Sequence, residues 1–264
     1  MTTPLCNGSR KVPSIPRDYI SNNLDVPRFD HLFPQMMEAD KSLSSWPWFR
    51  KSVDHVWRVD RRNPIVGFIS RDEASVLYNS AKLFAGKRAI EVGALRGWST
   101  VHLLASGVSS LDVVEPLLAD REWRLEFEET LKGSGGYDRA KLMPAPSPDG
   151  VEALAAAGGR WSFAFIDGDH DGDAPKRDAL VVEPFLETTA MVFFHDLVSP
   201  FVADGLLALG ARGWNIAAYQ TAQMMGVAWR GDVEPVPHRP DPEQAIWETP
   251  DHLSGVRLIG PNGA

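Results

Sequence analysis

Short apolar runs alternate with helix-compatible stretches through the middle of the chain. Ser70 and Glu73 have the spacing of a capping box ahead of a mostly apolar run, which predicts a helix beginning near residue 70. The pattern then predicts seven strands, at 88–92, 111–114, 141–143, 163–166, 190–194, 214–219 and 225–229. Between these strands it predicts one helix that begins at residue 98 and four more at 117–131, 150–157, 173–186 and 201–209. This alternation is typical of a mostly parallel, Rossmann-like α/β sheet with helices on both faces.

The two ends of the chain lack this regularity. The first sixty or so residues show no period of two or of 3.6, but contain large aromatic residues, among them Trp46, Trp48, Phe49 and Trp57. Residues 1–69 are therefore interpreted as an aromatic-rich appendage that serves as a structural clasp, a lid over a substrate site or an oligomer contact. Residues 70–230 form the α/β domain, and the Pro-, Asp- and His-rich tail 231–264 is expected to be irregular.

Composition narrows the classes of partner. A length of 264 residues suits one large α/β domain with a modest appendage. The net charge of -8 argues against a protein that neutralises nucleic-acid phosphates, so a small-molecule partner is expected instead. The single cysteine, Cys6, excludes an intrachain disulfide and a cysteine metal cluster. With neither a signal-peptide pattern nor an apolar membrane span, the protein is expected in the cytoplasm, without a membrane partner.

A glycine-containing turn follows the first predicted strand of the domain. Gly93 and Gly97 allow a sharp turn and the close approach of a ligand, at the strand end where parallel sheets collect ligands. A dinucleotide fingerprint needs glycine also at 95 and 98, where this chain has Leu95 and Trp98. A phosphate-binding P-loop needs a lysine that the turn lacks. The turn therefore favours an uncharged or cationic ligand over a nucleotide phosphate.

Ionisable residues end three of the predicted strands. Glu115 follows the second strand, about twenty residues after the turn, where a carboxylate can accept hydrogen bonds from a ribose diol. Two later strands end in acidic and imidazole groups, namely Asp167 with His170 and His195 with Asp196. Unpaired charged groups at the ends of buried strands lower the stability of the fold. Their presence therefore favours a functional role over a structural one. Adjacent parallel strands would bring all four into one pocket.

These motifs resemble those of class I S-adenosylmethionine-dependent methyltransferases, whose first motif is matched by Glu91, Gly93, Gly97 and Ser99. The resemblance implies that Glu91 lies near the methionine end of the cofactor, that the glycines approach it, and that Ser147 and Asp167 also belong to its site. The later motifs, Ile-Asp-Gly-Asp-His and His-Asp, resemble a subgroup that includes catechol-O-methyltransferase-like, cephalosporin-hydroxylase-like and macrolide-sugar O-methyltransferases. In its metal-using members, the positions of Asp167, His195 and Asp196 hold a divalent cation such as Mg²⁺.

The reaction predicted from this resemblance is methyl transfer to a small-molecule hydroxyl, or less favourably an amine, in natural-product or sugar modification. Two mechanisms stay open: a metal that lowers the pKa of the acceptor hydroxyl, and a metal-free base supplied by His170 or His195. A lyase or cyclase that uses the same cofactor and a non-catalytic binding protein are the alternatives. The other histidines are expected at the surface or as caps, and the stretch 219–229 is expected to be a core strand pair.

Overall fold

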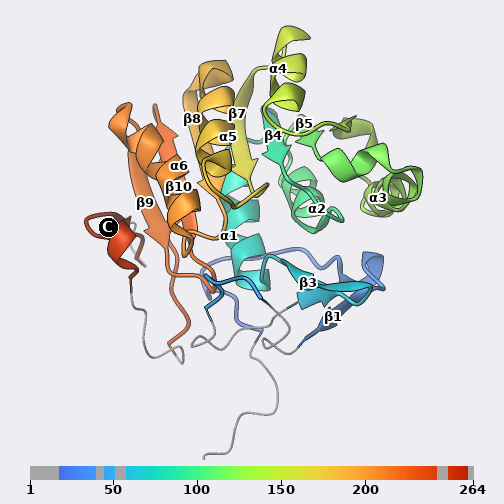
Figure 1. The fold of residues 1–264 in the computed structure, drawn as a ribbon, viewed down its shortest axis with the longest axis horizontal. Helices are drawn as coiled ribbons and strands as arrows, with labels where there is room; N and C mark the ends of the chain where they lie inside the picture. The colour runs from blue at the N-terminus through green and yellow to red at the C-terminus, as the bar shows by residue number, and fades with distance from the viewer. Residues whose placement is uncertain (1–17, 40–44, 51–57, 243–248, 261–264) are drawn as a thin grey trace, which may run out of the picture.

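A computed structural model describes residues 18–39, 45–50, 58–242 and 249–260 (Figure 1). Cys6, His55 and Trp57 therefore lie outside the described residues. The main sheet has eight strands in the order β11-β9-β10-β8-β7-β4-β5-β6. Their bounds are β4 Arg88–Val92, β5 Ser110–Val114, β6 Ala140–Met143, β7 Trp161–Ile166, β8 Leu186–Phe194, β9 Asn215–Tyr219, β10 Met225–Arg230 and β11 Arg257–Leu258.

The five strands from β6 to β8 are mutually parallel, whereas β10 runs antiparallel to both β8 and β9. Two layers of helices cover the sheet, and each layer packs into its own buried cluster. One layer contains α1 Arg71–Lys82, α2 Trp98–Ala105 and α3 Arg121–Gly133. The other contains α4 Asp149–Ala156, α5 Ala174–Val182 and α6 Pro200–Ala211. The chain therefore has the expected Rossmann-like three-layer architecture.

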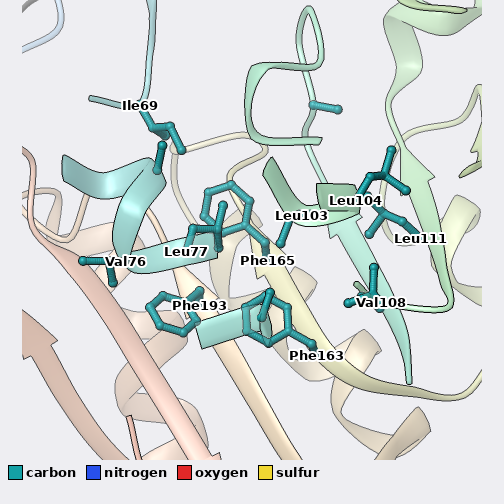
Figure 2. Close-up of a cluster of buried hydrophobic side chains, with 14 of the residues drawn as sticks. Ile69, Val76, Leu77, Leu103, Leu104, Val108, Leu111, Phe163, Phe165 and Phe193 are labelled. Carbon is teal, nitrogen blue, oxygen red and sulfur yellow. The ribbon is translucent and has the colours of Figure 1, made fainter. Parts of the chain in front are cut away.

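Aromatic residues of the central strands fill the buried cluster between the sheet and the layer of α1, α2 and α3. Figure 2 shows Phe165 of β7 close to Leu77 of α1 and Leu103 of α2. Phe163 and Phe193, on the adjacent strands β7 and β8, stack with their ring centroids 5.6 Å apart. Because these side chains are fully buried, the hydrophobic effect and ring packing hold α1 and α2 firmly on the sheet that carries the glycine turn.

The seven predicted strands are all present, and two predicted helices are shorter than expected. The stretch 117–131 is divided at Asp120, whose side chain accepts a hydrogen bond from the Trp123 N–H and caps a new helix. The stretch 173–186 leaves α-helical geometry after Val182, because Pro184 cannot continue the hydrogen-bond ladder. The eighth strand, β11, corrects the expectation of a wholly irregular tail: two residues are too few for a visible period, yet they pair in parallel with β9.

The N-terminal region contains a separate antiparallel sheet that lies below the main sheet in Figure 1. Its strands are β1 Met36–Glu38, β2 Arg58–Asp60 and β3 Asn63–Phe68, and β3 leads directly into α1. Short 3-10 helices occupy 30–32, 116–119, 137–139, 183–185 and 251–253. No helix in the described ranges combines the length and the apolar character that crossing a bilayer requires. The boundaries at residues 69 and 230 stay predictions.

Candidate active site

A cavity of about 810 Å³ opens at the carboxyl ends of the central strands. The loops after β4, β5, β7 and β8 contribute its walls, and the N-terminal residues Trp46 and Pro47 contribute one side. This volume lies within the range of about 300–1,000 Å³ that is typical of small-molecule sites. The four loops meet here because their strands are parallel neighbours, which is where ligands collect in such sheets.

The glycine turn adopts the predicted sharp geometry, and close packing within the protein adds a second requirement for glycine. Gly93 and Gly97 have φ values of +83° and +89°, in the region that favours glycine. A Cβ on Gly93 would lie 2.2 Å from the main-chain oxygen of Asp167, and a Cβ on Gly97 would lie 3.1 Å from the ring of Phe127. The close neighbours are therefore parts of the protein itself. Gly93 lines the cavity, whereas Gly97 precedes α2 outside the cavity lining.

Glu115 holds the glycine turn in place. Its Oε2 accepts hydrogen bonds from the main-chain N–H groups of Ala94 and Leu95, at 2.9 and 2.8 Å. Its Oε1 accepts one from the N–H of Leu117 at 2.9 Å. The residue is 5% exposed and lines the cavity. Because a carboxylate offers about four lone-pair sites, Glu115 can organise the turn and still face a ligand.

Glu91 and Ser99 occupy different positions relative to the cavity. The Glu91 carboxyl is fully buried outside the cavity lining, where its Oε2 accepts a hydrogen bond from Thr100 Oγ1 at 2.6 Å. Burial raises the pKa of Glu91 to about 8, against the hydrogen bonds from Ser99 and Thr100, which lower it. Ser99 and Ser147 line the cavity. Burial raises the pKa of Asp178, which also lines the cavity.

The four ionisable residues predicted at the ends of β7 and β8 do converge. His170 Nε2 lies 3.3 Å from Asp167 Oδ1 and 3.6 Å from Asp196 Oδ2. His195 Nδ1 lies 3.4 Å and 3.1 Å from the same two oxygens. Main-chain hydrogen bonds fix this arrangement, because the Asp167 N–H donates to Val92 and the His195 N–H donates to Ile166. Asp196 adopts φ +62°, an uncommon conformation for a non-glycine residue.

Mutual attraction in the cluster shifts its pKa values strongly. Burial disfavours the charged form of His195, but Asp196, Asp167 and Glu73 outweigh it and raise the pKa of His195 well above its ordinary value. The pKa of His170 is raised in the same way, against burial, mainly by Asp196 and Asp167. Burial alone would raise the pKa of Asp167, yet His195 and His170 lower it. The two carboxylates therefore favour the protonated form of both imidazoles.

The donor atoms of the cluster suit a divalent cation. Donor atoms of Asp167, His170 and Asp196 all lie within 4.8 Å of one another, and His195 Nδ1 faces the same two carboxylates. This group contains His170, which was not a predicted ligand, and shares Asp167 and Asp196 with the predicted set of Asp167, His195 and Asp196. Mixed imidazole and carboxylate donors fit Mn²⁺, Fe²⁺, Co²⁺ or Zn²⁺ better than Mg²⁺, which prefers oxygen.

Two residues of the site were not found from the sequence. Glu73, recognised only as half of a capping box, forms that box and also places its Oε2 3.3 Å from His195 Nε2. Gln223 donates from its side-chain Nε2 to Asp196 Oδ1 at 3.2 Å, and its main-chain N–H donates to Glu73 Oε1 at 2.9 Å. Gln223 stood in a stretch interpreted as core strands. The capping box was the one signal that singled out Glu73.

The N-terminal region contributes one wall of the cavity. The indole of Trp46 lies against the imidazole of His170, with ring centroids 5.7 Å apart. The main-chain N–H of Arg50 donates to Gln223 Oε1 at 3.1 Å, which ties the segment 45–50 to the loop before β10. These contacts place aromatic surface directly beside the ionisable cluster.

Two other histidines correct the expectation of surface positions. His102 is fully buried in α2, and its Nδ1 lies 2.7 Å from the carbonyl oxygen of Trp98. His238 is also fully buried, with Nε2 2.8 Å from Asp72 Oδ2. Both are buried against segments distant in sequence, Phe29 for His102 and Asp72 for His238, and the sequence around a single histidine gives no sign of such packing. His31 is exposed, and His252 Nε2 lies 2.9 Å from the Leu197 carbonyl oxygen.

Comparison with known proteins finds similarity to methyltransferases. Residues 90–197 match a family model described as a methyltransferase domain. Solved structures with a similar fold include an O-methyltransferase from Bacillus cereus in complex with S-adenosylhomocysteine, at 13% identity and a TM-score of 0.53, covering 62% of this chain and 83% of that one. Another is the O-methyltransferase TomG from Streptomyces achromogenes, involved in tomaymycin synthesis and solved with S-adenosylmethionine. It is 15% identical, with a TM-score of 0.50, and the match covers 62% of this chain and 82% of that one. No curated protein matches the chain in sequence.

The fold also supports other chemistry. It is shared by the precorrin-8w decarboxylase of Methanobacterium thermoautotrophicum, at 14% identity and a TM-score of 0.51, covering 64% of this chain and 95% of that one. At such identities the structures establish the fold alone. The family match is more specific, because residues 90–197 run from β4 to the loop after β8 and contain the turn and the cluster. Residues 90–197 are therefore similar to the methyltransferase-domain family, and the chain around them has the fold found in S-adenosylmethionine-dependent O-methyltransferases.

Proposed function

We propose that this protein transfers the methyl group of S-adenosylmethionine to a hydroxyl group of a small molecule, in natural-product or sugar modification. One observation carries the proposal: Asp167, His170, His195 and Asp196 converge in the cavity that also contains the glycine turn. The relatives from Bacillus and Streptomyces, both O-methyltransferases, support a hydroxyl over an amine acceptor.

We assign the cofactor to the part of the cavity lined by Gly93, Ser99, Glu115 and Ser147. Glu115 is the candidate for accepting hydrogen bonds from the ribose. The glycine turn, which Glu115 holds through the N–H groups of Ala94 and Leu95, forms the surface of the cavity on which the cofactor would lie. S-adenosylmethionine carries a cationic sulfonium and no phosphate, so it needs no basic anion-binding residue in the turn. Glu91 and Gly97 act from behind this surface by supporting the turn rather than by touching the cofactor.

The pKa directions favour the metal-assisted mechanism over the metal-free base. A general base must be unprotonated at the working pH, but the pKa values of His170 and His195 are raised, which favours their protonated forms. A divalent cation held by Asp167, Asp196, His195 and His170 would take the place of those protons. When bound, such a cation supplies Lewis-acid chemistry that lowers the pKa of an acceptor hydroxyl.

The remaining residues of the site position the acceptor. Trp46 and Pro47 form an apolar wall beside the cluster, against which a ring-bearing acceptor can lie while its hydroxyl faces Asp167 and Asp196. Positioning of this kind, in line with the methyl group, contributes a large share of the rate in group transfer.

The first experiment is isothermal titration of the full chain with S-adenosylmethionine and, as a negative control, NAD. We expect micromolar binding of S-adenosylmethionine only, weakened about tenfold or more by Glu115→Gln, because an amide nitrogen cannot accept the hydrogen bonds from the turn. Glu122→Gln, an exposed helix residue, is the matched control and should bind as the wild type does. Absence of binding by the wild-type protein would overturn the cofactor assignment.

The second experiment identifies the reaction. Incubation with a panel of catechols and hydroxylated sugars, with and without EDTA, should give S-adenosylhomocysteine and a methyl ether only when metal is present. Methylthioadenosine as the product would instead support a lyase or cyclase, and turnover unaffected by EDTA would overturn the metal-assisted mechanism. The cytoplasmic location and the homo-oligomer stay predictions.

A further inference from the structure

Glu73 is a buried carboxylate at the meeting point of three elements. Its Oε2 accepts the Ser70 N–H at the start of α1, at 2.7 Å, and its Oε1 accepts the Gln223 N–H from the loop before β10. The same Oε2 lies 3.3 Å from Nε2 of His195, the residue that follows β8. With 1% of its surface exposed and two main-chain donors holding it, this carboxylate has a fixed position and little freedom to turn away.

The two nitrogens of His195 face different partners. Nδ1 faces Asp167 and Asp196, on the side of the proposed cation. Nε2 is buried and forms no hydrogen bond of good geometry among the described residues, although Glu73 lies within ion-pair distance of it. A neutral imidazole carries its proton on only one nitrogen, and only the other nitrogen can bind a metal. The proton must therefore sit on Nε2 for Nδ1 to act as a ligand.

We propose that Glu73 is a positioning residue that accepts the Nε2–H of His195 and thereby directs the Nδ1 lone pair toward Asp167 and Asp196. The inference rests on the proposed metal-assisted function and adds a residue outside the donor set. Carboxylate partners of this kind fix the tautomer and ring orientation of a ligating histidine, and their loss typically weakens metal binding about 10–100-fold. The capping box of α1 is thus also the support of the cation site.

The first test is titration of the metal-free full chain with Co²⁺, followed by visible absorption. We expect Glu73→Gln to weaken Co²⁺ binding about 10–100-fold and to change the cobalt spectrum, because the His195 nitrogen is less well oriented. Ser70→Ala is the matched control: it removes the side-chain half of the same capping box without touching His195, and it should bind Co²⁺ as the wild type does. Equal affinity and spectrum for Glu73→Gln and the wild type would overturn the inference.

A double-mutant comparison separates positioning from general destabilisation. If Glu73 acts through His195, Glu73→Gln should have no further effect on Co²⁺ affinity in a His195→Ala background. The same fold loss in both backgrounds would overturn the inference. If the wild-type protein itself binds no Co²⁺, the metal part of the proposed function fails, and the inference fails with it for a distinguishable reason.

A spectroscopic test needs no variant of Glu73. In the wild-type protein loaded with diamagnetic Zn²⁺, two-bond ¹H–¹⁵N correlations should show the His195 proton on Nε2 and the metal on Nδ1. The resonance is identified by its absence in His195→Ala. A proton on Nδ1 of His195 in the Zn²⁺-loaded protein would overturn the inference whatever the effect of substitutions.

Discussion

The main-chain oxygen of Asp167 stands 2.2 Å from the position that a Cβ on Gly93 would occupy. This closeness joins the end of β4 to the end of β7, where the Asp167 N–H also donates to the Val92 carbonyl oxygen at 2.8 Å. The glycine of the turn after β4 is thus required by the approach of the chain that carries the ionisable cluster. The two halves of the site are coupled through the backbone itself.

We expect Gly93→Ala to destabilise the protein by about 4 kcal/mol or more. A positive φ costs a non-glycine residue about 1–2 kcal/mol, and here the new methyl group also overlaps rigid backbone. The matched control is Gly86→Ala, whose φ of +77° is similar but whose Cβ would meet nothing within 4 Å, so only the conformational cost of about 1–2 kcal/mol applies. Urea unfolding at constant pH measures both. Equal losses for the two variants would contradict the backbone contact.

The order of strands and helices could be predicted because each element has a local signature. The apolar runs of β4 and β7 end in turn or charged residues, and the capping box of α1 is contained within four residues. The convergence of Asp167 and Asp196 followed from parallel neighbours alone. These features depend on sequence spacing, which a single chain displays directly.

The rest of the site depends on contacts between distant segments. Nothing near Glu73 reveals that it faces His195, and nothing near Gln223 reveals its hydrogen bond to Asp196. The same holds for His102 and His238, whose burial comes from packing against other elements. The close packing at Gly93 could not be predicted for a related reason: its neighbour is the backbone that follows β7, more than seventy positions later.

The Glu91 carboxyl gives a prediction on stability. Its pKa in the folded protein is about 8, above the ordinary value of 4.5, so folding favours the neutral form and stability falls as pH rises from 4.5 toward 8. Glu91→Gln removes this penalty and should stabilise the protein at pH 7 by about 3 kcal/mol, with a smaller effect at pH 4.5. Thermal unfolding of this variant and of Glu122→Gln measures the difference. Weakened binding of S-adenosylmethionine by Glu91→Gln would show instead that a charged Glu91 serves the cofactor.

The buried His102 gives the opposite dependence on pH. Burial lowers its pKa to about 4, below the ordinary value of 6.5, so the unfolded chain binds a proton that the folded protein rejects. Its contribution to stability is present above pH 6.5 and is lost as the pH falls toward 4. Between pH 7 and pH 5 the loss should be about 2 kcal/mol. His102→Phe should lack this component in urea unfolding, and an unchanged pH dependence in that variant would contradict the assignment.

Metal binding at the proposed site should release protons. The pKa values of His170 and His195 are raised by Asp196 and Asp167, against burial, so both imidazoles hold protons near neutral pH in the metal-free protein. Since only an unprotonated nitrogen binds a metal, the affinity for Co²⁺ should rise with pH, by about tenfold per pH unit for each proton released.

Calorimetry in two buffers with different ionisation enthalpies, at pH 6, 7 and 8, counts those protons directly. We expect one to two protons per Co²⁺ for the wild-type protein and one fewer for His170→Ala, because that variant lacks one of the two raised imidazoles. Affinity that does not change between pH 6 and pH 8 would mean that neither imidazole meets the metal. In that case Asp167 and Asp196 alone would hold it, and an oxygen-preferring cation such as Mg²⁺ would become the better candidate.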